Sequence, residues 1–140
     1  MYRSYFVQNA TVLTNLKKIL LVDDEPDILN VLKSFFERTQ FFHICLACDG
    51  EEALRKINTD PPDLIILDLG LPKLPGIEVC KKVKMNEKLQ HIPIIVLTVK
   101  TEDVDRIICK VIGVDFYMVK PLNLRELLET VNKTLRLENT

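Results

Sequence analysis

The chain has 140 residues, of which 47% are hydrophobic and 28% charged, and its formal net charge is −1. This length suits one domain, and so small a net charge gives no general electrostatic reason for binding nucleic acid or a membrane surface. No apolar run approaches the roughly 18 residues of a membrane span and the N-terminus lacks a signal-peptide pattern, so we expect a cytoplasmic protein.

Residues 1–16 are mixed in character and have no clear period, so we expect an N-terminal extension or linker, followed by one domain over residues 17–140. Short apolar runs then recur along the chain, and such runs are typical of strands buried on both faces. They are Ile19–Val22, Phe42–Ala47, Leu64–Leu67, Ile94–Leu97 and Phe116–Val119.

The segments that follow these runs have the apolar spacing of amphipathic helices. Residues expected to share a helix face are Ile28, Leu32, Phe35 and Phe36; Ala53, Leu54 and Ile57; Ile77, Cys80 and Val83; Val104, Ile107, Ile108 and Val111; and Leu124, Leu127, Leu128, Val131 and Leu135. Asp49 precedes Glu52 by three positions, which resembles a capping box. Asn123 precedes Glu126 in the same way.

Alternating strands and helices predict an α/β protein with a parallel sheet and right-handed crossovers. We therefore expect a flavodoxin-like (βα)5 fold, a doubly wound parallel sheet with strand order 2-1-3-4-5. The chain also has four cysteines. Cys45 and Cys48 form a C-x-x-C, but no second Cys or His pair has zinc-site spacing, so we expect reduced cysteines that take part in packing.

Polar side chains follow four of the predicted strands at their carboxyl ends. Asp23 and Asp24 follow the first strand, Asp68 the third, Thr98 the fourth and Lys120 the fifth. Each alone has an ordinary explanation, since an Asp-Asp after a strand is more often a solvated turn and a Thr reflects β propensity. In the expected strand order the first and third strands are neighbours, so the three acids would converge at one edge of the sheet.

Converging carboxylates repel one another by roughly 4 kcal/mol per pair at 4 Å and an effective dielectric of 20. Either one acid takes a proton or a cation neutralises them, and oxygen ligands with open positions suit Mg²⁺ together with a phosphoryl group. Lys120 could neutralise a phosphoryl oxygen, and Thr98 could donate a hydrogen bond to another. An ionised Asp68 could then attack phosphorus and become an acyl phosphate.

From about Lys17 to Arg136 the sequence resembles the response-regulator receiver domains of two-component signalling. The segments that carry the resemblance are ILLVDDEPD (19–27), LIILDLGLPKLPG (64–76), IIVLT (94–98) and GVDFYMVKPL (113–122). The resemblance implies a signalling switch phosphorylated by a sensor histidine kinase or a phosphotransfer protein, which then binds a protein target. It implies no direct binding of nucleic acid by this domain and no enzymatic activity beyond phosphoryl transfer to itself and self-dephosphorylation.

The resemblance also assigns roles to individual residues. Asp68 matches the phosphorylated aspartate, Asp24 the direct ligand of Mg²⁺ or Mn²⁺, and Asp23 the acid that holds metal-bound water. Gly70 matches the position whose backbone carbonyl is a metal ligand.

The remaining matches concern the switch. Thr98 and Lys120 match the hydroxyl and lysine that contact the phosphoryl group, and the Lys120–Pro121 bond is expected to be cis. Tyr117 matches the switch aromatic, whose ring turns inward as the hydroxyl moves toward the phosphoryl group. On the residues alone, Tyr117 would be a half-buried strand tyrosine.

Four positions depart from the family pattern or tune it. Val99 replaces a residue that is usually small, and Lys100 and Gly70 occupy positions that influence hydrolysis of the acyl phosphate. Phe116 stands where an acid is common, and we expect its ring to be exposed.

Two other functions use a similar fold or chemistry. A phosphohydrolase of the haloacid dehalogenase type also has an aspartyl nucleophile with Mg²⁺, but it needs an acid two residues later, where this chain has Gly70, and its nucleophile follows the first strand. Binding of flavin mononucleotide needs a phosphate loop after the first strand, where Asp23, Asp24 and Glu25 would repel phosphate unless a metal intervened.

Overall fold

The computed structural model describes residues 16–99, 102–121 and 123–137. All but the last residue of the predicted extension 1–16 lies outside these ranges, as does Lys100.

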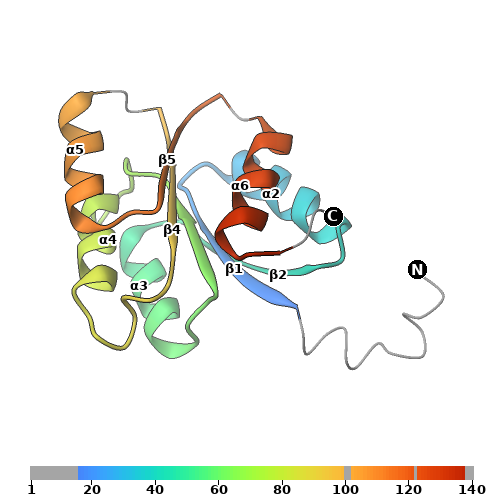
Figure 1. The fold of residues 1–140 in the computed structure, drawn as a ribbon, viewed down its shortest axis with the longest axis horizontal. Helices are drawn as coiled ribbons and strands as arrows, with labels where there is room; N and C mark the ends of the chain where they lie inside the picture. Colours follow the sequence, from blue (N-terminus) through green and yellow to red (C-terminus); the bar gives the residue numbers. More distant parts are fainter. Residues whose placement is uncertain (1–15, 100–101, 122, 138–140) are drawn as a thin grey trace.

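A parallel sheet forms the centre of the molecule (Figure 1). Its strands are β1 (Lys17–Val22), β2 (Phe42–Ala47), β3 (Leu64–Leu67), β4 (Ile94–Thr98) and β5 (Phe116–Val119). Their order is β2-β1-β3-β4-β5, which confirms the predicted topology. The first strand begins earlier than predicted because Lys17 pairs with Phe42, and the fourth continues to Thr98, which pairs with Val119.

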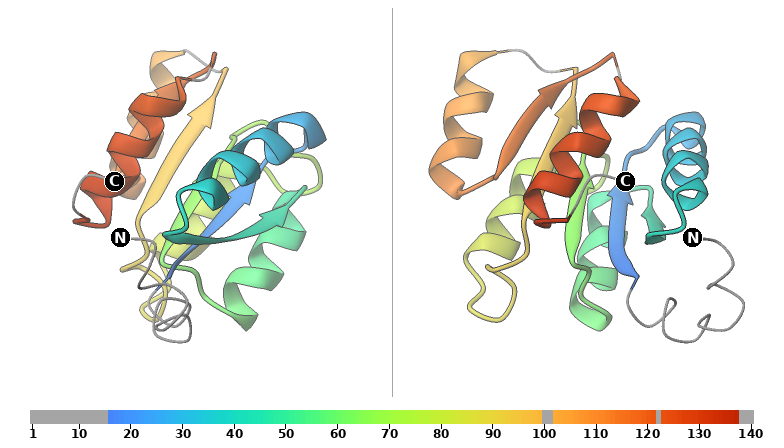
Figure 2. Two further views of the ribbon diagram at one scale, coloured as in Figure 1. Left: turned by 90° about the vertical axis from the view of Figure 1, so that its right-hand side faces the viewer. Right: turned by 45° about the vertical axis from the view of Figure 1, so that its right-hand side comes forward.

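Helices cover both faces of the sheet. They are α2 (Pro26–Arg38), α3 (Gly50–Thr59), α4 (Gly76–Lys84), α5 (Asp103–Ile112) and α6 (Leu124–Thr134). Figures 1 and 2 show α2 and α6 on one face and α3, α4 and α5 on the other. This arrangement confirms the doubly wound fold. No helix within the described ranges combines the length and the apolar character needed to cross a membrane.

Two of these helices begin at the predicted caps. The side chain of Asp49 accepts a hydrogen bond from the backbone N–H of Glu52 at 2.7 Å, and that of Asn123 accepts one from the N–H of Glu126 at 3.0 Å. Each bond satisfies a backbone donor that the first turn of a helix leaves without a partner. Local polar residues therefore set the starts of α3 and α6.

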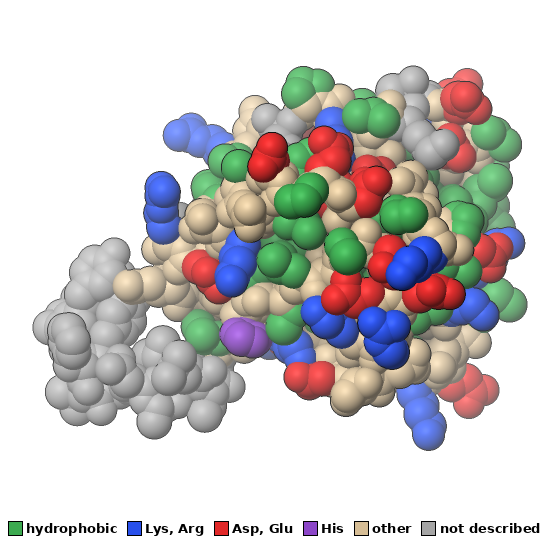
Figure 3. Space-filling view, turned by 180° about the vertical axis from the view of Figure 1, so that it is seen from behind, with side chains coloured by type: hydrophobic (Ala, Val, Ile, Leu, Met, Phe, Trp, Pro, Cys, Tyr) green, Lys and Arg blue, Asp and Glu red, His purple; other side chains and the backbone are tan. Residues whose placement is uncertain are grey.

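The core consists of two apolar layers, one on each face of the sheet. Every residue of β3 is buried, as is every residue of β4, which explains their continuous apolar sequences. Burial of each large aliphatic side chain contributes about 1.5–3 kcal/mol to folding. The face in Figure 3 intersperses acidic and basic side chains with hydrophobic ones, as the small net charge suggests.

The apolar stripe predicted for α5 is not the face that the helix buries. Of its four members, Val104, Ile107 and Val111 are 54%, 61% and 81% exposed and only Ile108 is partly buried. The covered side instead includes Cys109, which is buried, and Ile112, which is partly buried. The helix itself was predicted correctly, but its packed side is rotated from the most apolar stripe. Which side is covered depends on the neighbouring elements, so periodicity alone was wrong for three of the four residues.

Phe116 also differs from its expected environment. Its ring is half-buried against the layer beneath α2 and α6, and the Nζ atom of Lys133 lies 5.9 Å from the ring centroid. Successive side chains of a strand point to opposite faces of the sheet, and that of Phe116 points toward α6. The sequence of β5 alone does not tell which of its two faces a helix covers. The prediction of an exposed Phe116 was therefore wrong.

All four cysteines are free thiols. Cys80 and Cys109 are buried and Cys45 is partly buried, as expected for packing residues. Cys48, however, is exposed, because it lies beyond the end of β2, in the turn before α3.

Candidate metal centre

The first side chains of the site come from the turn between β1 and α2. Asp23 is 4% exposed, and its backbone N–H donates to the carbonyl of Ala47, which continues the strand ladder. Its Oδ1 atom accepts a hydrogen bond from the N–H of Glu25 at 2.9 Å. Asp24, between them, is exposed. The turn therefore presents one buried and one exposed carboxylate at the edge of the sheet.

The next strand of the sheet places Asp68 beside them. Val22 pairs with Leu67, and the N–H of Asp68 donates to the carbonyl of Val22 at 3.0 Å. The side chain of Asp68 is nearly buried, and its Oδ1 atom accepts from the N–H of Gly70 at 3.1 Å. Parallel pairing of β1 with β3 thus brings together acids that are far apart in the sequence.

Lys120 follows β5, the edge strand of the sheet, and supplies a positive charge to the site. Its Nζ atom lies 2.8 Å from Oδ2 of Asp23, 3.2 Å from Oδ2 of Asp68 and 3.6 Å from Glu25. Its backbone N–H donates to the carbonyl of Thr98, and its bond to Pro121 is cis, as predicted. The lysine side chain is only 7% exposed, so its charge is directed at the acids.

The three aspartates form a set of oxygen ligands. Carboxylate oxygens of Asp23, Asp24 and Asp68 all lie within 4.8 Å of one another. These three acids and Glu25 surround the ammonium of Lys120, so acids outnumber cations among the described residues of the site. Oxygen-only donors and excess negative charge are the chemistry that Mg²⁺ and Mn²⁺ prefer, so the residues fit a divalent ion.

Burial and hydrogen-bond partners shift the pKa values of the two buried aspartates in opposite directions. Burial raises the pKa of Asp23 above its usual value, even though Lys120 and the N–H of Glu25 favour the ionised form. Burial also disfavours ionisation of Asp68, but hydrogen bonds from Thr98 and Gly70 and the charge of Lys120 lower its pKa overall. Asp68 is therefore ionised at neutral pH beside a buried ammonium, which suits a nucleophile.

Comparison with known proteins assigns the chain to a family. The model of the response regulator receiver domain matches residues 19–132, most of the chain. The chain belongs to the response regulator receiver domain family. It is thus a receiver domain of two-component signalling, as the sequence predicted.

One curated relative of this receiver domain is about twice as long as the segment that matches it. The receiver domain is 48% identical over 120 residues to the alkaline phosphatase synthesis transcriptional regulatory protein PhoP of Bacillus subtilis (strain 168), covering 86% of this chain and 49% of PhoP. The chain therefore spans about half the length of this curated relative.

Solved structures match the fold over most of the chain. A two-component response regulator from Clostridium difficile is 35% identical with a TM-score of 0.80, covering 89% of this chain and 99% of that one. The Mn(2+)-bound form of response regulator Rcp1 is 30% identical with a TM-score of 0.76, covering 89% of this chain and 96% of that one.

The position of the receiver's expected switch residues is also defined. Thr98 is fully buried at the end of β4, and Tyr117 is half-buried on β5, packed against the layer beneath α3, α4 and α5. The guanidinium carbon of Arg106 lies 4.7 Å from the centroid of the Tyr117 ring. Burial raises the pKa of the Tyr117 hydroxyl, so this ring is neutral at physiological pH.

The loop after β3 approaches Asp68 too closely for a side chain at Gly76. A Cβ atom there would meet the carbonyl oxygen of Asp68 at 2.5 Å and the Cα atom of Leu69 at 2.6 Å. The N–H of Gly76 donates to the carbonyl of Leu69 at 3.0 Å, which closes the loop against the strand end. This glycine therefore fixes the backbone that carries Asp68.

Sequence reasoning missed the contributions of Glu25, Gly76 and Arg106. Glu25 completes the acidic run after β1, and Gly76 ends a segment that matches the family, so both had a signal in the sequence. Nothing in the local pattern of α5 indicates that Arg106 lies over Tyr117, because this contact joins a helix to a strand.

A second group of ligand-type atoms has a structural explanation. Cys48, Asp49 and Glu52 offer ligand atoms within 4.8 Å of one another. Asp49 caps α3, however, and Glu52 accepts a hydrogen bond from the backbone N–H of Cys48 at 2.7 Å. Both carboxylates thus satisfy backbone donors at the start of the helix.

Proposed function

We propose that this receiver domain is a switch that accepts a phosphoryl group on Asp68 from a sensor histidine kinase or a phosphotransfer protein. The observation that carries the proposal is the nearly buried Asp68 carboxylate with the ammonium of Lys120 at 3.2 Å and two further aspartates beside it. The proposal assigns residues 17–140 to the receiver domain and residues 1–16 to an extension or linker.

The proposed metal ligands are Asp23, Asp24, Asp68 and the backbone carbonyl of Gly70, with Mg²⁺ or Mn²⁺ as the ion. The clustering of the three carboxylates supports this set, and the related regulator Rcp1 is described as Mn(2+)-bound. A bound divalent ion would supply positive charge to offset the carboxylates and an incoming phosphoryl group.

In the proposed reaction, a carboxylate oxygen of Asp68 attacks phosphorus, and the bond from phosphorus to the donor's histidine nitrogen breaks. The nitrogen keeps the electron pair, and the new carbon–oxygen–phosphorus linkage is an acyl phosphate. The ammonium of Lys120 neutralises a phosphoryl oxygen while staying within the acidic cluster. Later attack of water on phosphorus returns the free carboxylate, so the only catalysis proposed is self-phosphorylation and self-dephosphorylation.

The output proposed is a change in protein binding. The hydroxyl of Thr98 donates to the phosphoryl group, and the ring of Tyr117 turns inward to follow it. The target is a protein that recognises this changed surface, in the cytoplasm and without membrane contact. The relative PhoP is named a transcriptional regulatory protein, and this domain would regulate such an output without touching nucleic acid itself.

Intact-mass measurement tests the assignment of Asp68. Acetyl phosphate with Mg²⁺ should add one phosphoryl group to the wild type and none to Asp68→Asn, and EDTA should prevent the addition. Glu78→Gln, at a half-buried acid on α4 outside the cluster, is the matched control and should behave as the wild type. Equal uptake by the wild type and Asp68→Asn would contradict the proposal, and turnover of a phosphomonoester would favour the phosphohydrolase.

A further inference from the structure

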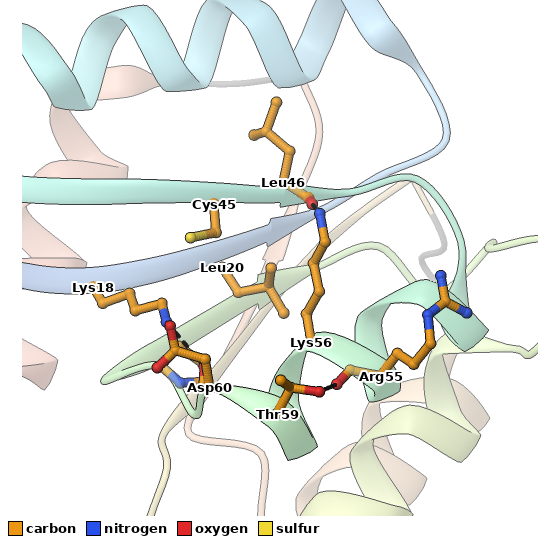
Figure 4. A pocket seen from close by; sticks show the side chains of 9 residues that line it. Lys18, Leu20, Cys45, Leu46, Arg55, Lys56, Thr59 and Asp60 are labelled. Atoms are coloured by element: carbon orange, nitrogen blue, oxygen red, sulfur yellow. Dashed lines mark hydrogen bonds and ion pairs between the residues drawn. The ribbon is translucent and has the colours of Figure 1, made fainter.

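A pocket of about 390 Å³ lies beside α3 and the edge of the sheet (Figure 4). Its walls include Lys18, Leu20, Cys45, Lys56, Thr59 and Asp60. The volume falls within the roughly 300–1,000 Å³ typical of small-molecule sites. None of its lining residues belongs to the metal centre, and the proposed phosphoryl chemistry does not use it.

The floor of the pocket is apolar. Leu20 of β1 is 2% exposed, and the thiol of Cys45 on β2 lies beside it at the edge of the sheet. Pro62, in the loop after α3, is buried and completes this surface. Leu20 and Pro62 are already covered, so the partly buried Cys45 and the aliphatic stem of Lys56 supply most of the apolar area that a ligand would remove from water.

The rim carries positive charge on two elements. Lys18 forms an ion pair with Asp60 and also donates to its backbone carbonyl at 3.0 Å. Lys56 extends from α3 across the pocket to the carbonyl of Leu46, at 2.5 Å, and lies 3.3 Å from Glu52. Arg55 also lines the pocket, so the lining itself carries three cations and one acid, Asp60. Two further acids stand next to it, Glu52 beside Lys56 and Asp63 at the backbone N–H of Lys18, and they balance the remaining positive charge.

Lys56 is the better placed of the two lysines to bind an anion. Both lysines are paired with a carboxylate, but the side chain of Lys18 is 17% exposed, whereas that of Lys56 is 47% exposed and so is open to a ligand. An ammonium has three N–H donors, and within the described ranges the contacts of Lys56 use two of them. One of its two partners is the neutral carbonyl of Leu46, which an anion can replace at a gain in electrostatic energy, while the exposed ion pair with Glu52 remains.

We propose that this pocket binds a small organic anion with an apolar body, such as an aromatic carboxylate. The apolar body lies on Leu20 and Cys45, and the acidic group pairs with Lys56. This is a ligand site beyond the proposed phosphorylation switch, and it would be present whether or not Asp68 accepts phosphate.

Titration of the protein with naphthalene-1-carboxylate, followed by amide NMR, tests the site. Saturable shifts should appear at Leu20, Cys45 and Leu46, with a Kd of about 0.1–1 mM, as expected for a ligand of this size. Binding should also slow alkylation of Cys45 by iodoacetamide. That measurement uses the Cys48→Ser background, because Cys48 is exposed while Cys80 and Cys109 are buried.

Two comparisons separate anion recognition from apolar contact. Lys56→Met keeps the aliphatic stem but removes the charge, and it should weaken binding about threefold to tenfold. Lys110→Met, at an exposed lysine of α5, is the matched control and should leave the Kd unchanged. The neutral naphthalene-1-carboxamide should bind more weakly to the wild type by a similar factor.

Three outcomes would overturn the proposal. The first is the absence of saturable shifts at the pocket, and the second is shifts confined to the exposed apolar residues Val104, Ile107 and Val111 of α5. The third is equal affinity of the carboxylate and the carboxamide, which would mean that the charge of Lys56 has no role. If Lys56→Met lowers the melting temperature substantially, the carboxamide comparison in the wild type decides the question.

Discussion

The ammonium of Lys120 lies 3.2 Å from a carboxylate oxygen of Asp68, although the two residues are 52 positions apart in the chain. The same Nζ atom donates to Asp23 at 2.8 Å. Its contacts join residues at the carboxyl ends of β1, β3 and β5, and its backbone N–H joins it to β4. One buried lysine thus contacts acids that follow two different strands.

Replacing this lysine should destabilise the metal-free protein and increase its response to metal. Lys120→Met leaves the buried carboxylates without their cation, which should lower the free energy of unfolding by about 1–3 kcal/mol in EDTA. Mg²⁺ should then restore more stability than it adds to the wild type, because the site is more negative. Urea unfolding with and without Mg²⁺ checks both expectations, and a variant as stable as the wild type in EDTA would contradict the first.

Removal of an acid from the cluster should have the opposite effect on the metal response. Mg²⁺ should raise the melting temperature of the wild type by mass action, and Asp24→Asn should remove most of this increase. The variant should be no less stable than the wild type in EDTA, since it loses like-charge repulsion in an exposed position. Thermal scans at several Mg²⁺ concentrations test this, with Asp27→Asn as an exposed control.

Gly70 and Gly76, the two glycines near Asp68, should differ sharply in how much stability is lost when each is replaced by alanine. Gly76→Ala places a Cβ atom against backbone atoms at 2.5 and 2.6 Å, so we expect a loss of about 1–3 kcal/mol. At Gly70 a Cβ atom would meet only Oδ1 of Asp68, at 4.0 Å, so Gly70→Ala should change stability little. The denaturant midpoints of the two variants compare their stabilities directly. Similar losses of stability would contradict the close contact between Gly76 and the backbone of Asp68 and Leu69.

The helix cap at Asp49 should contribute stability that depends on pH. The hydrogen bond from the N–H of Glu52 lowers the pKa of this carboxyl, with Lys73 assisting, so the folded state favours its ionised form. The contribution is therefore present above the ordinary pKa of 3.8 and is lost as the pH falls through the lower pKa of the folded state. Asp49→Ala should be less stable than the wild type at pH 7, and the difference should shrink in strong acid.

Asp49→Asn is the control for that experiment, because asparagine caps a helix without a charge. At pH 7 the free energy of unfolding should be lower than in the wild type by a smaller amount for Asp49→Asn than for Asp49→Ala. If the gap between wild type and Asp49→Ala does not change with pH, the charge of Asp49 has no role in the cap.

The coupling between Thr98 and Tyr117 should be separable from phosphorylation. If Asp68 is the phosphoacceptor, Thr98→Ala should still take up phosphate. A charge-assisted hydrogen bond from Thr98 is worth roughly 1.5–3 kcal/mol, so its loss should reduce the population of the active state about 10- to 150-fold. NMR shifts of Tyr117 with beryllofluoride test this, and an undiminished response would contradict the coupling.

The contact of Arg106 with the ring of Tyr117 should favour the ring position seen in this structure over the inward position. A cation–π contact at 4.7 Å between Arg106 and the Tyr117 ring is worth about 0.5–1 kcal/mol when exposed. Arg106→Gln should therefore favour the inward ring about twofold to fivefold. Arg125→Gln, at an exposed arginine of α6, is the matched control and should not alter the Tyr117 signals.

Much of this architecture follows from local sequence. The apolar runs of β3 and β4 are buried at every position, and Asp49 and Asn123 cap the helices that they precede. Strand order and right-handed crossovers then require Asp23 and Asp68 to lie side by side. The candidate site was therefore predictable, because its residues all follow strands that end at the same edge.

Only the tertiary structure decided which surfaces are covered. The most apolar stripe of α5 is exposed at Ile107, Phe116 is half-buried beneath α6, and Arg106 lies over Tyr117. Each of these facts depends on the position and rotation of a neighbouring element, which local periodicity does not encode. The need for glycine at position 76 likewise arises from a backbone brought near by folding. The sequence thus determined the strands, the helices and the edge of the sheet where the acids meet. Packing determined which face of each helix and strand is buried.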